Sequence, residues 1–369
     1  MKVLITGGGT GGHIYPAIAI ANKIKDEIKN IDILYVGSKK GMEGQLVPDA
    51  GYKFESIRVS GFKRSLSMDT FRSCIELCLG LKDAVRIIKS YKPDLIIGTG
   101  GFVCGPLVFI GSLFNIKTVI HEQNVIPGVT NKILSKFVDK VFISFEESKV
   151  YFNKSSKIAV TGNPVRKDFM QSNKKKCREE LGIDKDKLAV LAFGGSRGAE
   201  KINEAMMGVM TYFNGSSEIQ IIHVTGEVHY NKIISNLQDK TNNLSSNIEV
   251  KPYIHDMAKY MCACDLVISR SGAITLAEIT AIGLPSILIP SPNVTNNHQE
   301  YNAKVLEKNG SAILLTEANL NDKNIVNLLN KFLKNREQLR IMGEKSKGIS
   351  KPNAIESIYC NIIQLIDTM

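Results

Sequence analysis

The sequence predicts an α/β protein made of two related domains, each built on a parallel sheet. Short apolar segments alternate with helical segments along the chain, as in sheets that are covered by helices on both faces. The strand-like run 2–6 leads into the glycine-rich segment 7–12, and the same succession returns at 188–193 and 194–198. A length of 369 residues also exceeds one ordinary core and favours two domains.

In the first half, apolar runs with a preference for β-structure predict strands that helical segments separate. The longest helix is expected over about 69–89. In parallel sheets ligands bind outside the carboxyl ends of the strands. The glycine loops after Thr6 and Ile97 and the segment 121–124 are therefore expected to converge on one crevice. The expected strands are 2–6, 32–36, 53–59, 94–97, 118–121, 140–144 and 158–160.

The second domain is expected to start at the turn signal Gly162-Asn163-Pro164, which interrupts the alternation. The domains are thus predicted at 1–163 and 164–369. A lysine-rich helical piece over 174–181 precedes the second glycine loop, and amphipathic helices close the chain at about 324–333, 336–347 and 353–366. The expected strands of this half are 188–193, 219–224, 248–252, 266–269, 286–289 and 312–315.

Composition is that of a folded protein, with 43% hydrophobic and 22% charged residues. The net charge of +11 is uneven, because residues 1–163 carry +8 and the remainder +3. An excess of positive charge predicts an anionic partner, such as phosphates, nucleic acid or an acidic membrane surface. Seven cysteines without a CxxC pair indicate buried, reduced thiols, and six dispersed histidines predict no metal site.

The stretch 95–116 contains no charged residue and is long enough to cross a membrane. Gly98-Thr99-Gly100-Gly101 and Gly105-Pro106 interrupt it. A strand–loop–helix unit is therefore predicted in its place.

The glycines at 7, 9 and 12 match the GxGxxG pattern of dinucleotide-binding enzymes. Those enzymes need an acidic residue at the end of the second strand to bind the ribose. Here the second strand ends in Val36-Gly37-Ser38, and Asp32 opens the strand instead. Neither glycine loop continues into GK[ST], which excludes a P-loop nucleotidase.

The second half contains a better candidate for a diphosphate site. After a strand ending at Ser269, small residues lead into a helix that begins near Ala273, and free amides at a helix start suit a diphosphate. Glu278 could accept hydrogen bonds from two ribose hydroxyls, or it could be a solvated helix residue. The polar loop 291–303, with Gln299, could bind sugar hydroxyls, and the backbone of Ile254 could pair with a base.

Seven motifs follow one another over nearly the whole chain, namely GGGTGGH, GGFVCGP, HEQN, GNPVR, GGSRGA, RSGAITLAE and NNHQEYNA. Together they resemble the MurG family, the peptidoglycan N-acetylglucosaminyltransferases. The resemblance implies a GT-B fold, with two Rossmann-like domains facing each other across a cleft and the last helix crossing back to the first domain. It also implies inverting transfer of N-acetylglucosamine from UDP-GlcNAc to undecaprenyl-diphospho-N-acetylmuramoyl-pentapeptide (lipid I), which gives lipid II.

The family's motifs carry donor contacts over to matching positions of this sequence. UDP-GlcNAc is a co-substrate, and neither a cofactor nor a metal at a DxD motif is implied. Arg197 stands where relatives can carry Gln, which hardly affects the assignment. The implied donor contacts are Thr10, Gly11, Gly12, Asn124, Arg166, Ser196, Ile254, Ala273, Ile274, Thr275, Leu276, Ala277, Glu278 and Gln299.

Inverting transfer requires a base for the acceptor hydroxyl and groups that stabilise the departing diphosphate. His13 is the first candidate for the base, because imidazole titrates near neutral pH, and capping or acceptor positioning is its alternative role. Glu122 is the second candidate. The loops 7–12 and 100–106 are expected to bind the acceptor diphosphate, with contacts at Gly9, Gly101 and Gly105.

The lipid tail of such an acceptor stays in the bilayer, which predicts peripheral attachment at the cytoplasmic face of the bacterial membrane. A basic amphipathic helix after the Gly61-Phe62 loop fits anionic lipids, whereas 82–92 fits packing on the sheet. Further partners are expected among proteins of cell-wall synthesis and division. The residues predicted to contact the membrane are Phe62, Lys63, Arg64, Phe71, Arg72, Ile75 and Leu79.

Three rival functions remain open at this point. A diacylglycerol glucosyltransferase would share the sugar-nucleotide half, and a UDP-GlcNAc 2-epimerase would need more carboxylates in the cleft. A nucleic-acid-binding protein would explain the charge but neither the glycine loops nor Glu278, and basic clusters rich in aromatic residues are missing. Nucleic acid is therefore not an expected partner.

Overall fold

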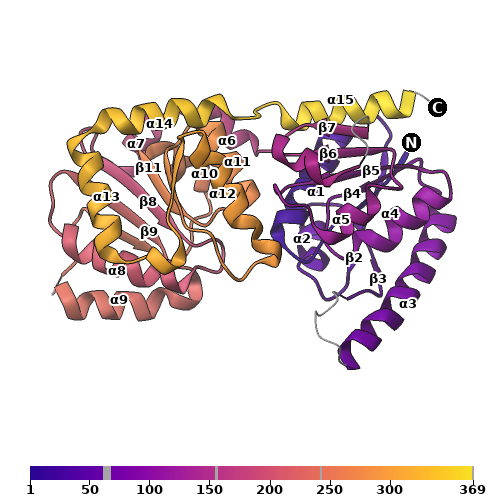
Figure 1. Ribbon diagram of the computed structural model, residues 1–369, viewed down its shortest axis with the longest axis horizontal. Coiled ribbons are helices and arrows are strands. Elements are labelled where there is room, and N and C mark those ends of the chain that lie inside the picture. Colours follow the sequence, from indigo (N-terminus) through magenta and orange to yellow (C-terminus); the bar gives the residue numbers. More distant parts are fainter. Residues whose placement is uncertain (61–67, 154–156, 242, 368–369) are drawn as a thin grey trace. The chain divides into compact units, whose positions relative to one another are not determined.

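The computed structural model describes residues 1–60, 68–153, 157–241 and 243–367, and the side chains of 68–74 lie outside this description. The chain divides into two compact units (Figure 1). Unit 1 comprises Met1–Pro164 together with Asn353–Met369, and unit 2 comprises Val165–Pro352. The sequence places the division after Asn163, whereas the contacts leave Pro164 with unit 1 and assign the final helix to unit 1 as well.

Unit 1 holds a seven-stranded parallel sheet in the order β3-β2-β1-β4-β5-β6-β7. Its strands are β1 (Lys2–Thr6), β2 (Asp32–Ser38), β3 (Lys53–Ile57), β4 (Leu95–Gly98), β5 (Lys117–Glu122), β6 (Lys140–Ile143) and β7 (Ile158–Val160). Its helices are α1 (Gly11–Glu27), α2 (Glu43–Asp49), α3 (Met68–Tyr91), α4 (Cys104–Leu113), α5 (Val129–Leu134), η1 (Glu146–Tyr151) and α15 (Ala354–Asp367).

Successive residues of the unit 1 strands pack into opposite layers, because side chains alternate along a strand. Leu4 and Ile96 belong to the core beneath α3 and α4, whereas Ile5 and Ile97 belong to the core beneath α1. Helix α15 completes the second layer with three buried side chains, Ile358, Ile362 and Leu365. The C-terminal helix is therefore part of the unit 1 core (Figure 1).

Unit 2 holds a six-stranded parallel sheet in the order β10-β9-β8-β11-β12-β13. Its strands are β8 (Leu188–Phe193), β9 (Ile219–Val224), β10 (Ile248–Lys251), β11 (Leu266–Ser269), β12 (Ser286–Leu288) and β13 (Ala312–Leu314). Its helices are α6 (Lys167–Gln171), α7 (Lys174–Leu181), α8 (Glu200–Phe213), α9 (Glu227–Thr241), α10 (Met257–Ala263), α11 (Ala273–Ile282), η3 (Thr295–Asn297), α12 (His298–Lys308), η4 (Glu317–Asn319), α13 (Asp322–Lys334) and α14 (Arg336–Gly348).

The predicted fold class is confirmed, since both sheets are parallel and helices alternate with the strands. The uncharged stretch 95–116 forms the predicted strand–loop–helix unit, β4 followed by α4. Several ends differ from the prediction by one or two residues. Strand β2 runs on to Ser38, for example, because Gly37 and Ser38 still pair with Ser56 and Ile57 of β3. Ladder hydrogen bonds, and not hydrophobicity alone, decide where a strand ends.

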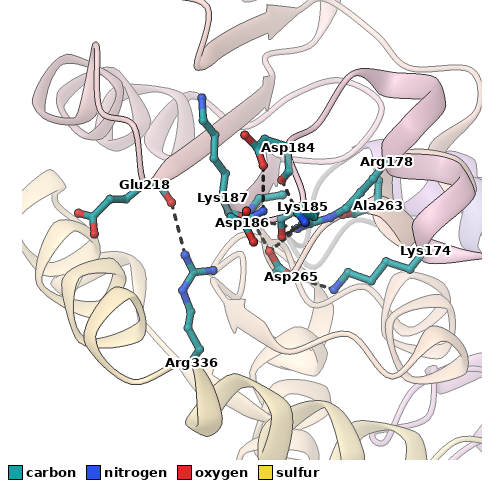
Figure 2. A network of polar contacts seen from close by, with 11 residues as sticks. Lys174, Arg178, Asp184, Lys185, Asp186, Lys187, Glu218, Ala263, Asp265 and Arg336 are labelled. Carbon is teal, nitrogen blue, oxygen red and sulfur yellow. Dashed lines mark hydrogen bonds and ion pairs between the residues drawn. The ribbon is translucent and has the colours of Figure 1, made fainter.

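A buried arginine, Arg178, links the amino ends of β8 and β11 in unit 2 through hydrogen bonds (Figure 2). The guanidinium of Arg178 on α7 lies 2.5 Å from the Asp265 carboxylate, and its side chain is 9% exposed. The same carboxylate accepts a hydrogen bond from the Ala189 amide and forms an ion pair with Lys174. Arg178 also donates to four backbone carbonyls, those of Ala263, Asp184, Lys185 and Lys187.

Replacement of Arg178 should therefore cost far more stability than replacement of Lys174. We expect Arg178→Met to lower the free energy of unfolding by about 3 kcal/mol, because it leaves four backbone carbonyls without this donor and removes the buried cation beside Asp265. Lys174 is half exposed, so Lys174→Met is the matched control and should cost less than about 1 kcal/mol. Urea unfolding followed by circular dichroism measures both, since the chain has no Trp. Equal losses would contradict this role of Arg178.

Candidate functional site

In unit 1, the loops after β1, β4 and β5 emerge at the same edge of the sheet, because the strands are parallel. The two glycine loops contact each other directly, since the Gly8 amide donates to the Gly100 carbonyl at 3.3 Å. Gly101 has a φ of +83°, and a Cβ there would lie 2.3 Å from the Gly8 carbonyl oxygen. Only glycine at this position allows the loops to approach so closely.

A buried carboxylate fixes the shape of the first glycine loop. Glu43 on α2 is fully buried, and its two oxygens accept hydrogen bonds from the amides of Gly9 (3.1 Å) and Ser38 (3.0 Å). A Cβ at Gly8, Gly37 or Gly41 would lie 2.3–2.6 Å from this side chain, so the three glycines make room for it. Glu43 thus links the carboxyl ends of β1 and β2. No motif in the sequence around Glu43 indicates this role.

His13 lies in the first turn of α1, directly after the glycine loop. Its Nδ1 lies 3.1 Å from the carbonyl oxygen of Thr99 and 3.2 Å from Oε1 of Gln123. The Thr99 hydroxyl donates to the His13 carbonyl at 2.8 Å. The histidine is therefore held from both its ring and its backbone by the segments that follow β4 and β5.

Glu122, the second candidate base, is 1% exposed. One carboxylate oxygen accepts from the Asn124 amide at 3.0 Å, and the other accepts from the Gly128 amide (3.0 Å) and from Nδ2 of Asn131 (2.8 Å). Both oxygens of Glu122 are thus engaged in shaping the loop 122–131. Asn124, a predicted donor contact, owes its position to this carboxylate.

In unit 2, the predicted donor residues follow the carboxyl ends of β8, β10, β11 and β12. Ser196 is exposed in the loop after β8, Ile254 is buried after β10, and α11 follows β11. Helix α11 begins at Ala273 after Gly272, without a side-chain cap or an acidic residue in its first turn. The positive end of the helix dipole lies at such a helix start and favours a bound anion.

Glu278 lies further along the same helix, and its side chain is 15% exposed. Burial raises the pKa of this carboxyl to about 7, and Arg166, whose Nε lies 3.8 Å away, opposes the shift. Asp168 adds to the rise. Arg166 also lies over the ring of Phe169, with its guanidinium carbon 4.9 Å from the ring centre. A carboxylate suits the hydroxyls of a ribose, and a guanidinium suits a diphosphate.

The predicted donor contacts are divided between the two units. Thr10, Gly11, Gly12 and Asn124 belong to unit 1, and the remaining contacts belong to unit 2. Ala273 and Leu276 are 6% and 1% exposed, and the Leu276 amide donates to the Gly272 carbonyl, while Ile274, Thr275 and Ala277 are partly exposed. Oε1 of Gln299 accepts a hydrogen bond from the Ser291 amide, so the amide nitrogen of Gln299 points away from Ser291.

Not every residue of the predicted membrane surface can be placed. Phe62, Lys63 and Arg64 lie outside the described residues, as do the side chains of Phe71 and Arg72. On α3, Ile75 is 48% exposed and Leu79 is partly exposed. Within the described ranges, no helix is both long enough and apolar enough to cross a membrane. The same residues contain no cluster of three or more His, Cys, Asp or Glu side chains suited to a metal ion.

Two family models match the chain, the glycosyltransferase family 28 N-terminal domain over residues 3–143 and the C-terminal domain over 189–358. The UDP-N-acetylglucosamine–N-acetylmuramyl-(pentapeptide) pyrophosphoryl-undecaprenol N-acetylglucosamine transferase of Acetivibrio thermocellus is 48% identical over 97% of this chain and 96% of its own length. The enzyme of the same name from Clostridioides difficile is 46% identical, over 100% of this chain and 90% of its own length.

Among solved structures, MurG of Acinetobacter baumannii matches with a TM-score of 0.80 and 28% identity, covering 100% of this chain and 99% of that one. A UDP-GlcNAc 2-epimerase from Neisseria meningitidis, bound to UDP-GlcNAc, matches with a TM-score of 0.70 at 14% identity, over 99% of this chain and 100% of that one. The epimerase shares the fold alone. Both family models, the two relatives and the MurG structure match this chain over most of its length. The chain therefore belongs to the MurG family of glycosyltransferase family 28.

Proposed function

We propose that this enzyme transfers N-acetylglucosamine from UDP-GlcNAc to lipid I and so forms lipid II, the lipid-linked precursor of peptidoglycan. The observation that carries the proposal is the 48% identity, over 97% of the chain, to a relative that bears the name of this transferase. The reaction makes the protein a hexosyltransferase of cell-wall synthesis. UDP-GlcNAc is a co-substrate in it and not a cofactor.

The donor is proposed to bind mainly to unit 2. The first amides of α11 and the exposed hydroxyl of Ser196 would meet the diphosphate, and Glu278 would accept hydrogen bonds from the ribose hydroxyls. Arg166 would add a positive charge at the same place, since it already lies beside Glu278. Ile254 would pair with the uracil through its backbone, and Gln299 would bind a sugar hydroxyl through its free amide nitrogen.

Catalysis is proposed to depend on His13 as the base. His13 takes the proton of the acceptor hydroxyl, and the oxygen forms a bond to the anomeric carbon. The bond from that carbon to the UDP oxygen breaks at the same time, and UDP leaves with the electron pair. Helix-start amides that stabilise the leaving diphosphate lower the barrier without having to reorganise. His13 is preferred to Glu122, because both oxygens of Glu122 are engaged inside unit 1.

The acceptor diphosphate is proposed to bind the two glycine loops of unit 1. Gly101 and Gly105 would allow its close approach, and Gly11 and Gly12 contribute amides at the start of α1. The Gly9 amide already donates to Glu43, so Gly9 would act through its backbone shape, with a φ of +83°.

The enzyme is proposed to work at the cytoplasmic face of the cell membrane, because its acceptor carries a lipid chain. Helix α3 exposes Ile75 and packs against α4, which also packs against α5. Exposed lysines accompany apolar side chains on α5 and directly after it, namely Lys132 and Lys136. A surface of this kind binds anionic lipid through both apolar burial and charge. The exposed apolar side chains on α4, on α5 and directly after them are Leu113, Phe114, Val129, Ile133 and Phe137.

UDP release from UDP-GlcNAc, with and without a lipid I analogue, tests the function and its base together. We expect release to depend on the acceptor, and His13→Ala to lower kcat by about 100-fold or more. Conversion of UDP-GlcNAc without acceptor would contradict the transferase in favour of an epimerase. Turnover by His13→Ala within a few-fold of the natural protein would exclude His13 as the base.

Glu278→Gln should weaken UDP binding while it stabilises the folded protein. The pKa of Glu278 is about 7 in the folded state and lower in the unfolded state, so the unfolded chain loses this proton first as the pH rises. The contribution of the Glu278 carboxyl to the free energy of unfolding is fully present below about pH 4, and it is lost as the pH rises through about 7. At pH 8 the variant should be more stable by about 1 to 3 kcal/mol.

UDP binding by the same variant should be about 10- to 100-fold weaker by calorimetry, because a charged acceptor of the ribose is lost. Glu337→Gln on α14 is the matched control, since Glu337 is 57% exposed, and it should change neither quantity. Undiminished UDP affinity in Glu278→Gln would contradict the ribose contact, whatever the variant's stability.

Vesicle co-sedimentation tests the membrane surface. Binding should rise with the fraction of anionic lipid and fall with added salt, because charge attraction is screened. Ile75→Glu should weaken it, while Val228→Glu, at a residue of unit 2 that is 87% exposed, should leave it unchanged. Equal binding to neutral and anionic vesicles would contradict the electrostatic part, and equal loss in both variants would contradict the location.

A further inference from the structure

Behind His13, polar side chains form a chain of hydrogen bonds that leads into the interior of unit 1. His13 Nδ1 lies 3.2 Å from Oε1 of Gln123, and Nε2 of Gln123 lies 3.0 Å from Nδ1 of His121. Nε2 of His121 lies 3.0 Å from the carbonyl oxygen of Gly162. Gln123 and His121 are 2% and 0% exposed, so the direction of each hydrogen bond is set by the protein and not by water.

The inner end of this chain fixes the tautomer of His121. The carbonyl oxygen of Gly162 can only accept a hydrogen bond, so Nε2 of His121 must carry a proton. Burial lowers the pKa of His121 to about 4, which keeps the ring neutral near pH 7. Its Nδ1 then has a free lone pair and accepts from the amide nitrogen of Gln123.

The orientation of the Gln123 amide is fixed by further acceptors. Its Nε2 lies 2.8 Å from the Thr99 carbonyl oxygen and 3.3 Å from the His121 carbonyl oxygen, and neither oxygen can donate. The amide oxygen must therefore be the atom that faces His13. Nδ1 of His13 is thus within reach of two oxygens that only accept, those of Gln123 and Thr99.

We propose that Gln123 and His121 are positioning residues that hold His13 as the tautomer with its proton on Nδ1 and its lone pair on Nε2. The inference deepens the proposed function, in which Nε2 takes the proton of the acceptor hydroxyl. When Nε2 gains that proton, the Nδ1 proton already lies between two acceptors, so no group has to turn. Glu122, the neighbouring carboxylate, faces the loop 122–131, and the chain behind His13 therefore carries no ionised side chain.

Histidine tautomers can be measured directly, because protonated and unprotonated ring nitrogens differ widely in ¹⁵N chemical shift. The full-length protein, labelled with ¹⁵N in its six histidine rings, provides the spectrum, and loss of signals in His13→Ala assigns His13. We expect His13 protonated at Nδ1 and bare at Nε2 at neutral pH, and one buried ring, His121, in the opposite tautomer. His13 protonated at Nε2 instead, or a charged His121 at pH 7, would overturn the proposal.

Kinetics of Gln123→Leu test the consequence for catalysis. This variant keeps the bulk of the side chain and removes both of its hydrogen-bonding ends. We expect kcat to fall by roughly 10- to 100-fold with KM for UDP-GlcNAc changed less than about threefold, together with a mixture of His13 tautomers in the spectrum. Gln45→Leu, an exposed position on α2 of the same unit, is the matched control and should alter neither.

An unchanged kcat and unchanged His13 signals in Gln123→Leu would overturn the role of Gln123. These outcomes are distinct from failure of the proposed function. The tautomer of His13 is measured without turnover, so a protein that lacked acceptor-dependent UDP release would still report it. Conversely, an active transferase with His13 protonated at Nε2 would leave the function intact and refute the positioning chain.

Discussion

Hydrogen bonds that converge on Thr99 hold together the edge of unit 1 at which His13 lies. Its amide donates to the Thr6 carbonyl at 2.9 Å, which joins the ends of β1 and β4. Its hydroxyl donates to the His13 carbonyl, and its carbonyl accepts from Gln123 at the end of β5. Three strands and the first turn of α1 thus meet at one fully buried residue. The position of His13 depends on this junction.

The two units share one local arrangement at the carboxyl end of a parallel strand. In each, a parallel strand delivers a glycine-rich or small-residue loop to the start of a helix, whose amides attract anions. In unit 1 the buried carboxylate of Glu43 accepts hydrogen bonds from backbone amides and so restrains the first glycine loop. In unit 2 the first turn of α11 carries no acidic side chain, so its field stays available to a diphosphate.

The parallel sheets, the strand–loop–helix unit of β4 and α4 and the repeated opening of the two halves could all be predicted from apolar periodicity and glycine placement. The residues behind the site could not. The sequence around Glu43 gives no sign that this carboxylate is buried. Only the folded chain brings it against Gly8, Gly37 and Gly41. Gln123 belongs to the HEQN motif, but its proposed role depends on its distances to Thr99, which follows β4, and to His121 on β5. Single-sequence patterns carry no such long-range geometry.

In the proposed mechanism, His13 activates the acceptor hydroxyl, which displaces UDP directly in a single step. The most direct test is the anomeric configuration of the new glycosidic bond in the product made from UDP-GlcNAc and a lipid I analogue, read from the H1–H2 coupling in the proton NMR spectrum. UDP-GlcNAc is an α-linked donor, so a single displacement inverts the centre and predicts a β-linked product. An α-linked product would mean retention at the anomeric carbon, which a single displacement from the opposite face cannot give, and would contradict the proposed mechanism.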